Sequence, residues 1–250
     1  MKNKFQLQTP IITILANQIS STLAIQSVDN DKSKLEFLDF NNGELVNKTL
    51  TFNSFEIVKA FVGNILVLQE YDKDNFPAVK QLYTFDIVNQ EVLNVYKNAS
   101  FLALEGSKML VLNNINEQIS EQCFDIDVNI DELNNDTFKT NIFFPQNYRN
   151  DNLYYPEIVS FLSQYEAATI FDTVEYLEWN DLILISYYIC NEEQLFNNYL
   201  LVINSQGELV LSETLSENSK GTAEISFFIA HKHLVYLGNH QEITTMKLEF

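Results

Sequence analysis

Five short runs of apolar residues, many of them β-branched, recur along the chain, and each follows a polar turn. The runs lie at 23–25, 65–68, 109–112, 182–185 and 234–237. Their length and composition are typical of buried strands. The turns before them, such as Gly63-Asn64 and Asn180-Asp181, carry the residues that hairpins require. A recurring pattern of this kind indicates repeated hairpins, so we expect an all-β fold.

A second strand follows each apolar run and ends in a related signature. The residues at these ends are Asp39, Asp86, Asp125, Asn204 and Lys247. We interpret the aspartates as structural, because a carboxylate at the end of a strand accepts backbone N–H groups of the following turn. Turns at 42–43 and 206–207 then lead into a further strand. Since an apolar strand also lies upstream of the turn before most runs, the repeating unit is four strands long.

This order of strand, turn, strand with an aromatic-Asp ending, turn and strand resembles the WD-repeat and related β-propeller superfamily. The signature positions are mostly separated by the roughly 40–50 residues of a propeller blade. The resemblance implies a small β-propeller, with five blades of four antiparallel strands. A β-sandwich is the alternative, and it would leave the complementary ends of the chain unexplained.

The two ends of the chain complement each other. The last repeat stops after strands at 234–237 and 243–250, whereas strands at 5–8 and 11–15 precede the first repeat. Pairing of the N- and C-terminal strands would complete one blade and remove open sheet edges. We therefore expect one closed domain that spans residues 1–250.

The interval between Asp125 and Asn204 is about twice as long as the others. It contains either a degenerate sixth blade or an insertion at about 129–173 in a five-bladed ring, and we favour the insertion. Pro156, followed by apolar residues at 158, 161, 162 and 165, predicts a short amphipathic helix within 150–168.

The chain is strongly acidic, with a formal net charge of −19. Such a charge repels phosphate backbones and anionic lipid surfaces, so neither nucleic acid nor a membrane is an expected partner. The only cysteines, Cys123 and Cys190, form no disulfide framework, and we expect buried or inert thiols. The apolar stretch at 11–15 is too short for a secretory signal, which predicts a cytoplasmic protein. The oligomeric state is not indicated.

Residues 125–136 superficially match a calcium-binding loop of the EF-hand kind. Ile130, however, stands where that loop needs glycine, and alternating apolar and polar residues predict a half-buried strand instead. We expect no cofactor, with calcium at Asp125 and Asp127 as the alternative. His231, His233 and His240 are interpreted as residues of a solvated turn rather than as metal ligands.

The segment 148–155 holds the best candidate binding residues. Tyr148, Arg149, Tyr154 and Tyr155 combine aromatic rings with a guanidinium in an expected loop, a mixture suited to stacking on sugars or holding a peptide. The alternative is that the tyrosines anchor the insertion to the body of the fold.

The sequence holds no GxSxG elbow, phosphate-binding glycine loop, HExxH or CxxC motif. We therefore expect a noncatalytic scaffold that binds a protein, a peptide or a glycan through its loops. The alternative is a glycosidase- or lactonase-like hydrolase, in which carboxylates from several blades converge, with or without calcium.

Overall fold

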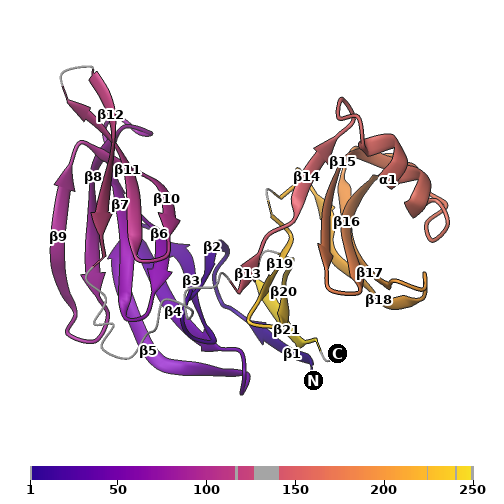
Figure 1. The fold of residues 1–250 in the computed structure, drawn as a ribbon, viewed down its shortest axis with the longest axis horizontal. Coiled ribbons are helices and arrows are strands. Elements are labelled where there is room, and N and C mark those ends of the chain that lie inside the picture. Colours follow the sequence, from indigo (N-terminus) through magenta and orange to yellow (C-terminus); the bar gives the residue numbers. More distant parts are fainter. Residues whose placement is uncertain (1, 116–117, 127–140, 224, 240, 249–250) are drawn as a thin grey trace. The chain divides into compact units, whose positions relative to one another are not determined.

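The computed structural model describes residues 2–115, 118–126, 141–223, 225–239 and 241–248. These residues form an all-β protein whose strands make five antiparallel sheets, with a single helix among the described residues (Figure 1). The chain divides into two compact units, residues 7–141 and residues 1–6 together with 142–250. Each unit has its own sheets and its own core, and a single domain over 1–250 stays a prediction.

The unit of residues 7–141 contains three sheets whose strands follow one another in chain order. The first sheet is made of β2 (Ile11–Ala16), β3 (Thr22–Asp29), β4 (Lys32–Asp39) and β5 (Glu44–Asn53). The second is made of β6 (Glu56–Val62), β7 (Ile65–Tyr71), β8 (Val79–Asp86) and β9 (Glu91–Lys97). The third is made of β10 (Ala99–Glu105), β11 (Lys108–Ile115) and β12 (Gln118–Asp125).

The other unit contains two five-stranded sheets and the helix α1 (Tyr155–Leu162). One sheet has the order β14 (Gln146–Arg149), β15 (Ile170–Trp179), β16 (Leu182–Cys190), β17 (Phe196–Asn204) and β18 (Leu209–Ser219). The second, called the terminal sheet, has the order β1 (Lys2–Gln6), β21 (Glu242–Lys247), β20 (His233–Gly238), β19 (Phe227–Ala230) and β13 (Ile142–Phe143).

The predicted repeat is confirmed at the level of single strands. The five apolar runs lie in β3, β7, β11, β16 and β20, and each of these strands is paired on both sides. The following strand ends at Asp39, Asp86, Asp125, Asn204 or Lys247, as expected. Asp39 and Asp86 accept the backbone N–H groups of Asn41 at 2.9 Å and Val88 at 2.7 Å, which confirms their structural role.

Pairing of the two ends of the chain is also confirmed, because β1 pairs antiparallel with β21 from Lys2 opposite Met246 to Gln6 opposite Glu242. The strand at 11–15 behaves differently from the expectation. It forms β2 and pairs with β3, its neighbour in sequence, so it belongs to the first sheet and not to the terminal one. A short turn brings β2 and β3 together at little entropic cost.

The sheets are not uniformly four-stranded, since the described residues give two sheets of four strands, one of three and two of five. The predicted insertion explains part of the difference, because β13 and β14 lie in it and pair with β19 and β15. The predicted helix is confirmed as α1, with Pro156 in its first turn, where the missing N–H costs no hydrogen bond. Residues 127–136 of the segment that superficially matches a calcium-binding loop, expected instead to form a half-buried strand, lie outside the described residues.

Two expectations about single side chains differ from the structure. Cys123 and Cys190, expected to be buried or inert thiols, are both exposed, so the expectation of burial is wrong and their inertness stays a prediction. Cys123 lies on β12, the outermost strand of its sheet, and Cys190 is the last residue of β16. His231 lies in the β19–β20 turn as predicted, but His233 is buried as the first residue of β20, with its Nδ1 3.1 Å from the carbonyl oxygen of His231.

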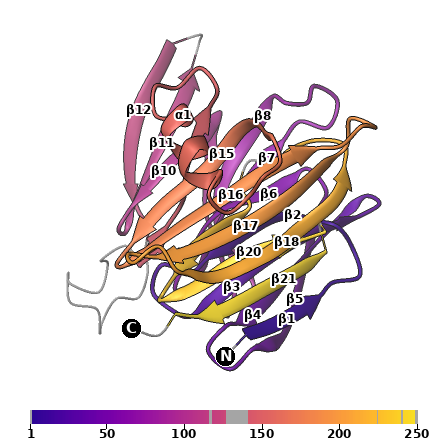
Figure 2. The same ribbon diagram turned by 90° about the vertical axis from the view of Figure 1, so that its right-hand side faces the viewer.

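Apolar side chains pack on both faces of the sheet β14–β18, with α1 on one side and the terminal sheet on the other (Figure 1 and Figure 2). On one face, side chains such as Leu184 and Val202 pack in a cluster with residues of the terminal sheet, including Phe227 and Leu234. On the other face a second apolar cluster includes Leu162 of α1. Burial on both faces explains why β16 is apolar along most of its length instead of alternating.

A buried glutamine joins neighbouring sheets twice in the unit of residues 7–141. Gln26 of β3 accepts the N–H of Val58 at 3.0 Å, and Gln69 of β7 accepts the N–H of Phe101 at 2.9 Å. Both N–H groups lie at a register shift in the first strand of the next sheet, between Val58 and Ala60 or after Phe101. A bulge of this kind frees an N–H group from its own ladder, and the glutamine satisfies it.

Replacing Gln26 by Leu should therefore lower the free energy of unfolding by about 1–3 kcal/mol, because the N–H of Val58 loses its acceptor in a buried place. Urea unfolding of Gln26→Leu measures the loss. The matched control is Gln8→Leu, which makes the same change at an exposed side chain. Equal stability of the two variants would show that the contact does not hold the sheets together.

Candidate ligand-binding site

A hollow of about 620 Å³ lies in the unit of residues 142–250, where β14 ends and β15 begins. Its walls come from three short segments of the chain. They supply Asn147, Arg149, Asn150, Asp151, Phe171, Asp172, Thr173, Thr222 and Ala223. Most of these residues carry hydroxyl, amide, carboxylate or guanidinium groups, so the hollow is polar.

Strand pairing fixes two of the walls relative to each other. Arg149 lies opposite Thr173 in the antiparallel register of β14 and β15. Just beyond the strand, the backbone N–H of Asn150 donates to the carbonyl of Asp172 at 2.9 Å, and the Asn150 side chain donates to the Asp172 carboxylate at 3.0 Å. The Thr173 hydroxyl donates to the Asn147 side chain at 2.5 Å. The walls are therefore held by hydrogen bonds before any ligand arrives.

The third wall is attached through Tyr188. The backbone N–H of Ala223 donates to the Tyr188 hydroxyl at 2.8 Å, and that hydroxyl lies 3.3 Å from the Ser226 hydroxyl. The one aromatic lining residue, Phe171, is half-buried and packs on Phe196 with ring centroids 4.6 Å apart. Because Phe196 packs against it, the Phe171 ring is held in place and can act as an apolar contact surface for a ligand.

Arg149 is the only arginine of the chain. Its exposed guanidinium forms no hydrogen bond or ion pair with any residue that the structure describes, whereas Lys2, Lys4, Lys34 and Lys80 each contact a glutamate at 2.5–2.9 Å. Asp151, also in the hollow, has no such partner in the described part of the chain. Within the described residues, the hollow thus offers a cation and a carboxylate that have no side-chain partner.

Of the four residues predicted for binding, only Arg149 lines this hollow. Tyr148 is half-buried, with its ring edge-on to Tyr154 at 6.4 Å and Tyr176 at 6.1 Å. Tyr155 begins α1 and packs against the cluster beneath the helix. Burial there, together with the nearby Asp172 carboxylate, raises the pKa of Tyr155. Tyr154 remains 58% exposed. Binding by the three tyrosines stays a prediction.

Glu175 is a buried carboxyl group that sequence reasoning missed. Its side chain is 2% exposed and accepts the backbone N–H of Ser226 with both oxygens at 3.0 Å. Desolvation raises the pKa of Glu175 to about 7, although hydrogen bonds from Ser226 and Ser186 oppose the rise. The apolar neighbours Val174 and Trp179 mark this part of β15 as core. Nothing in the local sequence distinguishes Glu175 from the exposed Glu178 on the same strand.

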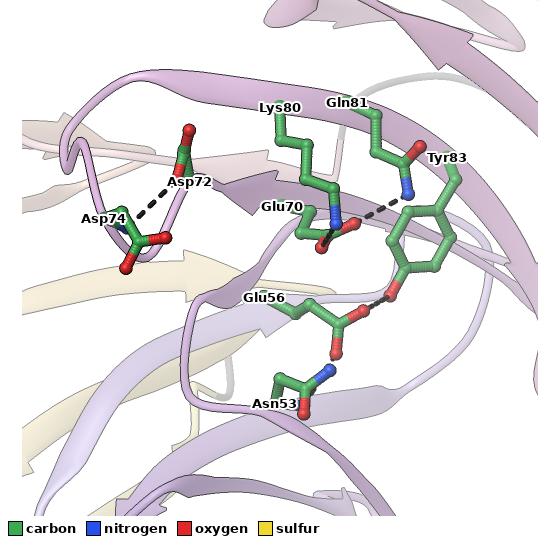
Figure 3. A network of polar contacts seen from close by, with 8 residues as sticks. All are labelled: Asn53, Glu56, Glu70, Asp72, Asp74, Lys80, Gln81 and Tyr83. Atoms are coloured by element: carbon green, nitrogen blue, oxygen red, sulfur yellow. Dashed lines mark hydrogen bonds and ion pairs between the residues drawn. The ribbon is translucent and has the colours of Figure 1, made fainter.

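A second hollow, of about 540 Å³, lies in the unit of residues 7–141 around the β7–β8 loop. Three of its charged side chains, Glu70, Asp72 and Lys80, already have partners (Figure 3). Lys80 contacts Glu70 at 2.5 Å, and Gln81 donates to the other Glu70 oxygen at 2.6 Å. Hydrogen bonds from the Asn75 side chain and the Asp74 N–H lower the pKa of Asp72.

The carboxylate of Glu56, which lies near this hollow, also has hydrogen-bond partners. It accepts the Tyr83 hydroxyl at 2.7 Å and the Asn53 N–H at 2.6 Å (Figure 3). Burial and the Glu56 carboxylate raise the pKa of Tyr83, so this hydroxyl stays a donor. Because Glu70, Asp72 and Lys80 already have partners and leave little for a ligand, the hollow around Arg149 is the better candidate site.

The described residues contain no group of three or more His, Cys, Asp or Glu side chains able to hold a metal ion. Asp125 is exposed at the end of β12, and Asp127 lies outside the described residues. Calcium at these two residues stays a prediction. Among the residues placed by the structure, no helix has the length and apolar character needed to span a bilayer.

No protein-family model matches the sequence, and no curated protein matches it. Some solved structures are similar to the chain at low scores. The uncharacterized protein lmo1340 from Listeria monocytogenes EGD-e has 10% identity and a TM-score of 0.34, over 97% of this chain and 95% of that one.

Two structures from peptidases are also similar to the chain. The β-propeller domain of the Trilobed protease from Pyrococcus furiosus has 8% identity and a TM-score of 0.31, over 92% of this chain and 63% of that one. A chain from a study of two prolyl endopeptidases has 9% identity and a TM-score of 0.30, over 91% and 38%. Scores of this size are too low to support an argument about the fold or activity of this chain.

Proposed function

We propose that the protein is a noncatalytic binding protein and that its ligand is a carbohydrate held in the hollow around Arg149. The observation that carries the proposal is the lining of the hollow. Amide, hydroxyl, carboxylate and guanidinium groups converge there from three segments that hydrogen bonds hold in place, beside the half-buried Phe171 ring. Binding sites gain affinity when such groups are positioned in advance.

The mixture of groups favours a carbohydrate over a peptide. Each sugar hydroxyl is both a donor and an acceptor, so it matches a wall that alternates acceptors such as Asp151 with donors such as Arg149. Peptides are generally recognised through apolar pockets or grooves in addition to backbone hydrogen bonds. Among the lining residues only Phe171 and Ala223 lack a polar side chain.

Replacing Asp151 by Ala should weaken carbohydrate binding about 10- to 100-fold, because a hydrogen bond to a charged group contributes about 1.5–3 kcal/mol. Calorimetric titration with a panel of neutral and uronate-containing oligosaccharides measures the change. The melting temperature of the variant should equal that of the unmodified protein, since Asp151 has no partner in the part of the chain that the structure describes.

Asp181→Ala is the matched control for this experiment. It removes the same carboxylate from an exposed turn of the same unit, outside the hollow, and should leave binding unchanged. The proposed function is wrong if no member of the panel binds at millimolar concentration. It is also wrong if Asp151→Ala and Asp181→Ala bind equally well.

A hydrolase acting on the same ligands is the second candidate, because two carboxylates, Asp151 and Asp172, line one hollow. Glycoside hydrolysis uses such a pair, one as acid and one as base or nucleophile. Asp172 is already bound by Asn150, which favours binding over catalysis. Release of shorter products from a bound oligosaccharide would establish the hydrolase instead.

We also propose that the five sheets are blades of one five-bladed propeller. The repeated strand order, the pairing of β1 with β21 and the matching contacts of Gln26 and Gln69 support this arrangement. In it, the β13 and β14 strands are additions at the edges of two blades. The hollow around Arg149 would then belong to a loop region, where propellers carry their binding sites.

A further inference from the structure

The candidate site places one basic side chain beside two carboxylates. With 34 acidic side chains against 15 basic ones, a cation has many carboxylates to pair with. Arg149 nevertheless has no hydrogen-bond or ion-pair partner among the described residues, although Asp151 and Asp172 line the same hollow. A guanidinium left unpaired in a preformed site keeps its five N–H donors for a ligand.

The backbone of Arg149 is well placed for this role. It ends β14 opposite Thr173, and the next residue, Asn150, is bonded to Asp172 through both its backbone and its side chain. Only the flexible part of the arginine side chain is therefore ordered when a ligand binds. The planar guanidinium matches a carboxylate through two parallel hydrogen bonds, which a lysine ammonium does not reproduce.

The rest of the hollow restricts which carboxylate-bearing ligands fit. Asp151 and Asp172 repel a ligand that carries negative charge throughout, but they accept hydrogen bonds from hydroxyl groups. A ligand with one carboxylate for Arg149 and several hydroxyls for the remaining walls satisfies both requirements. A sugar acid has this chemistry.

We propose that the carbohydrate bound in the hollow is acidic, a uronate-containing saccharide whose carboxylate pairs with Arg149. This inference rests on the proposed function and names the substrate class of that site. A neutral sugar would offer the guanidinium no carboxylate to pair with. A highly charged polyanion would be repelled by the two aspartates and by the overall negative charge of the chain.

The test compares a trisaccharide that carries a single galacturonate with the methyl ester of the same trisaccharide by calorimetric titration at pH 7. The two probes differ in charge and keep the same hydroxyls. The free acid should bind about 10- to 100-fold more tightly, the range that a charged hydrogen-bonded pair supplies. Arg149→Gln should abolish this difference between acid and ester, and Arg149→Lys should restore only part of it.

Lys232→Gln is the control variant, because it removes one positive charge from the exposed β19–β20 turn and leaves the lining of the hollow intact. It should preserve the preference for the acid. Equal affinity for acid and ester would overturn the inference while leaving carbohydrate binding standing. Loss of the preference in Lys232→Gln as well would show a general charge effect and also overturn it.

Two further results separate failure of the inference from failure of the proposed function. If neither galacturonate probe binds but neutral oligosaccharides do, the acidic-sugar assignment is wrong and the function survives. If no sugar binds and a short peptide with a free C-terminal carboxylate binds through Arg149, both are wrong and the partner is a peptide.

Discussion

Deleting residues 2–6 should destabilise the unit of residues 142–250 by about 3–5 kcal/mol. These residues form β1, which pairs along its whole length with β21, and a ladder hydrogen bond contributes about 1 kcal/mol. β1 also carries Lys2, whose ammonium contacts Glu213 at 2.5 Å and lies 5.7 Å from the centre of the Tyr236 ring. Without β1, the largely buried strand β21 becomes an open edge.

Urea unfolding followed by tryptophan fluorescence measures this loss directly. Trp179 is the only tryptophan and lies in the apolar cluster shared by β15–β18 and the terminal sheet, so it reports on this unit. Lys4→Ala is the control within the same strand. It removes an exposed ion pair to Glu242 and should cost less than about 1 kcal/mol.

A synthetic peptide of residues 1–8 should restore the lost stability of the deletion variant, because it can add to the free edge of β21 as a strand. A peptide with Lys4 replaced by Pro should restore less, since proline removes a ladder donor. An unchanged urea midpoint after the deletion would mean that pairing of the chain ends contributes nothing to the fold.

Glu175 should make the unit of residues 142–250 less stable as the pH rises from about 4.5 to about 7. Burial raises the pKa of Glu175 from 4.5 to about 7, so between these values the folded state binds a proton that the unfolded state has lost. Stability falls with pH wherever the folded state binds more protons. The whole effect is about 3 kcal/mol, from about 1.4 kcal/mol for each pH unit, and it levels off above the folded pKa.

Glu175→Gln should remove this dependence. The amide oxygen can still accept the N–H of Ser226, as the amides of Gln26 and Gln69 accept the N–H groups of Val58 and Phe101. The free energy of unfolding of the variant minus that of the unmodified protein should therefore be about 3 kcal/mol larger at pH 8 than at pH 4.5.

The measurement is urea unfolding of both proteins at pH 4.5, 6 and 8. Other titrating groups change the stability of the two proteins alike, so the difference between them isolates Glu175. Glu217→Gln, at an exposed position of β18, is the control and should give a difference that does not vary with pH. A flat difference for Glu175→Gln as well would show that this carboxyl titrates normally.

Much of the local structure could be predicted because its causes lie within a few residues of one another. Three kinds of signal act over less than one hairpin. They are the apolar runs, turn residues such as Gly63 and Asn180, and strand-end aspartates such as Asp39, which accepts a backbone N–H of the next turn. The helix α1 follows from Pro156 and the apolar period after it. The pairing of the chain ends could be inferred from counting strands.

The candidate site was only partly predictable. Arg149 could be selected as an isolated cation beside aromatic residues, but its neighbours Asp172 and Thr222 are distant in sequence. The tyrosines predicted with it turn toward other contacts, Tyr148 toward Tyr176 and Tyr155 toward the cluster under α1. Cys123 is exposed because β12 lies at an edge of its sheet. His233 is buried because it starts β20, a central strand.

The sequence by itself determined that this chain forms short antiparallel strands, where their turns lie, and that its two ends pair. The strands and turns follow from hydrophobic period and turn chemistry, which are local properties of the chain, and the pairing of the ends follows from counting strands. Tertiary structure alone decided that Glu175 is buried against Ser226 and that three segments meet around Arg149. These features depend on register and on packing between distant segments, which no local pattern encodes.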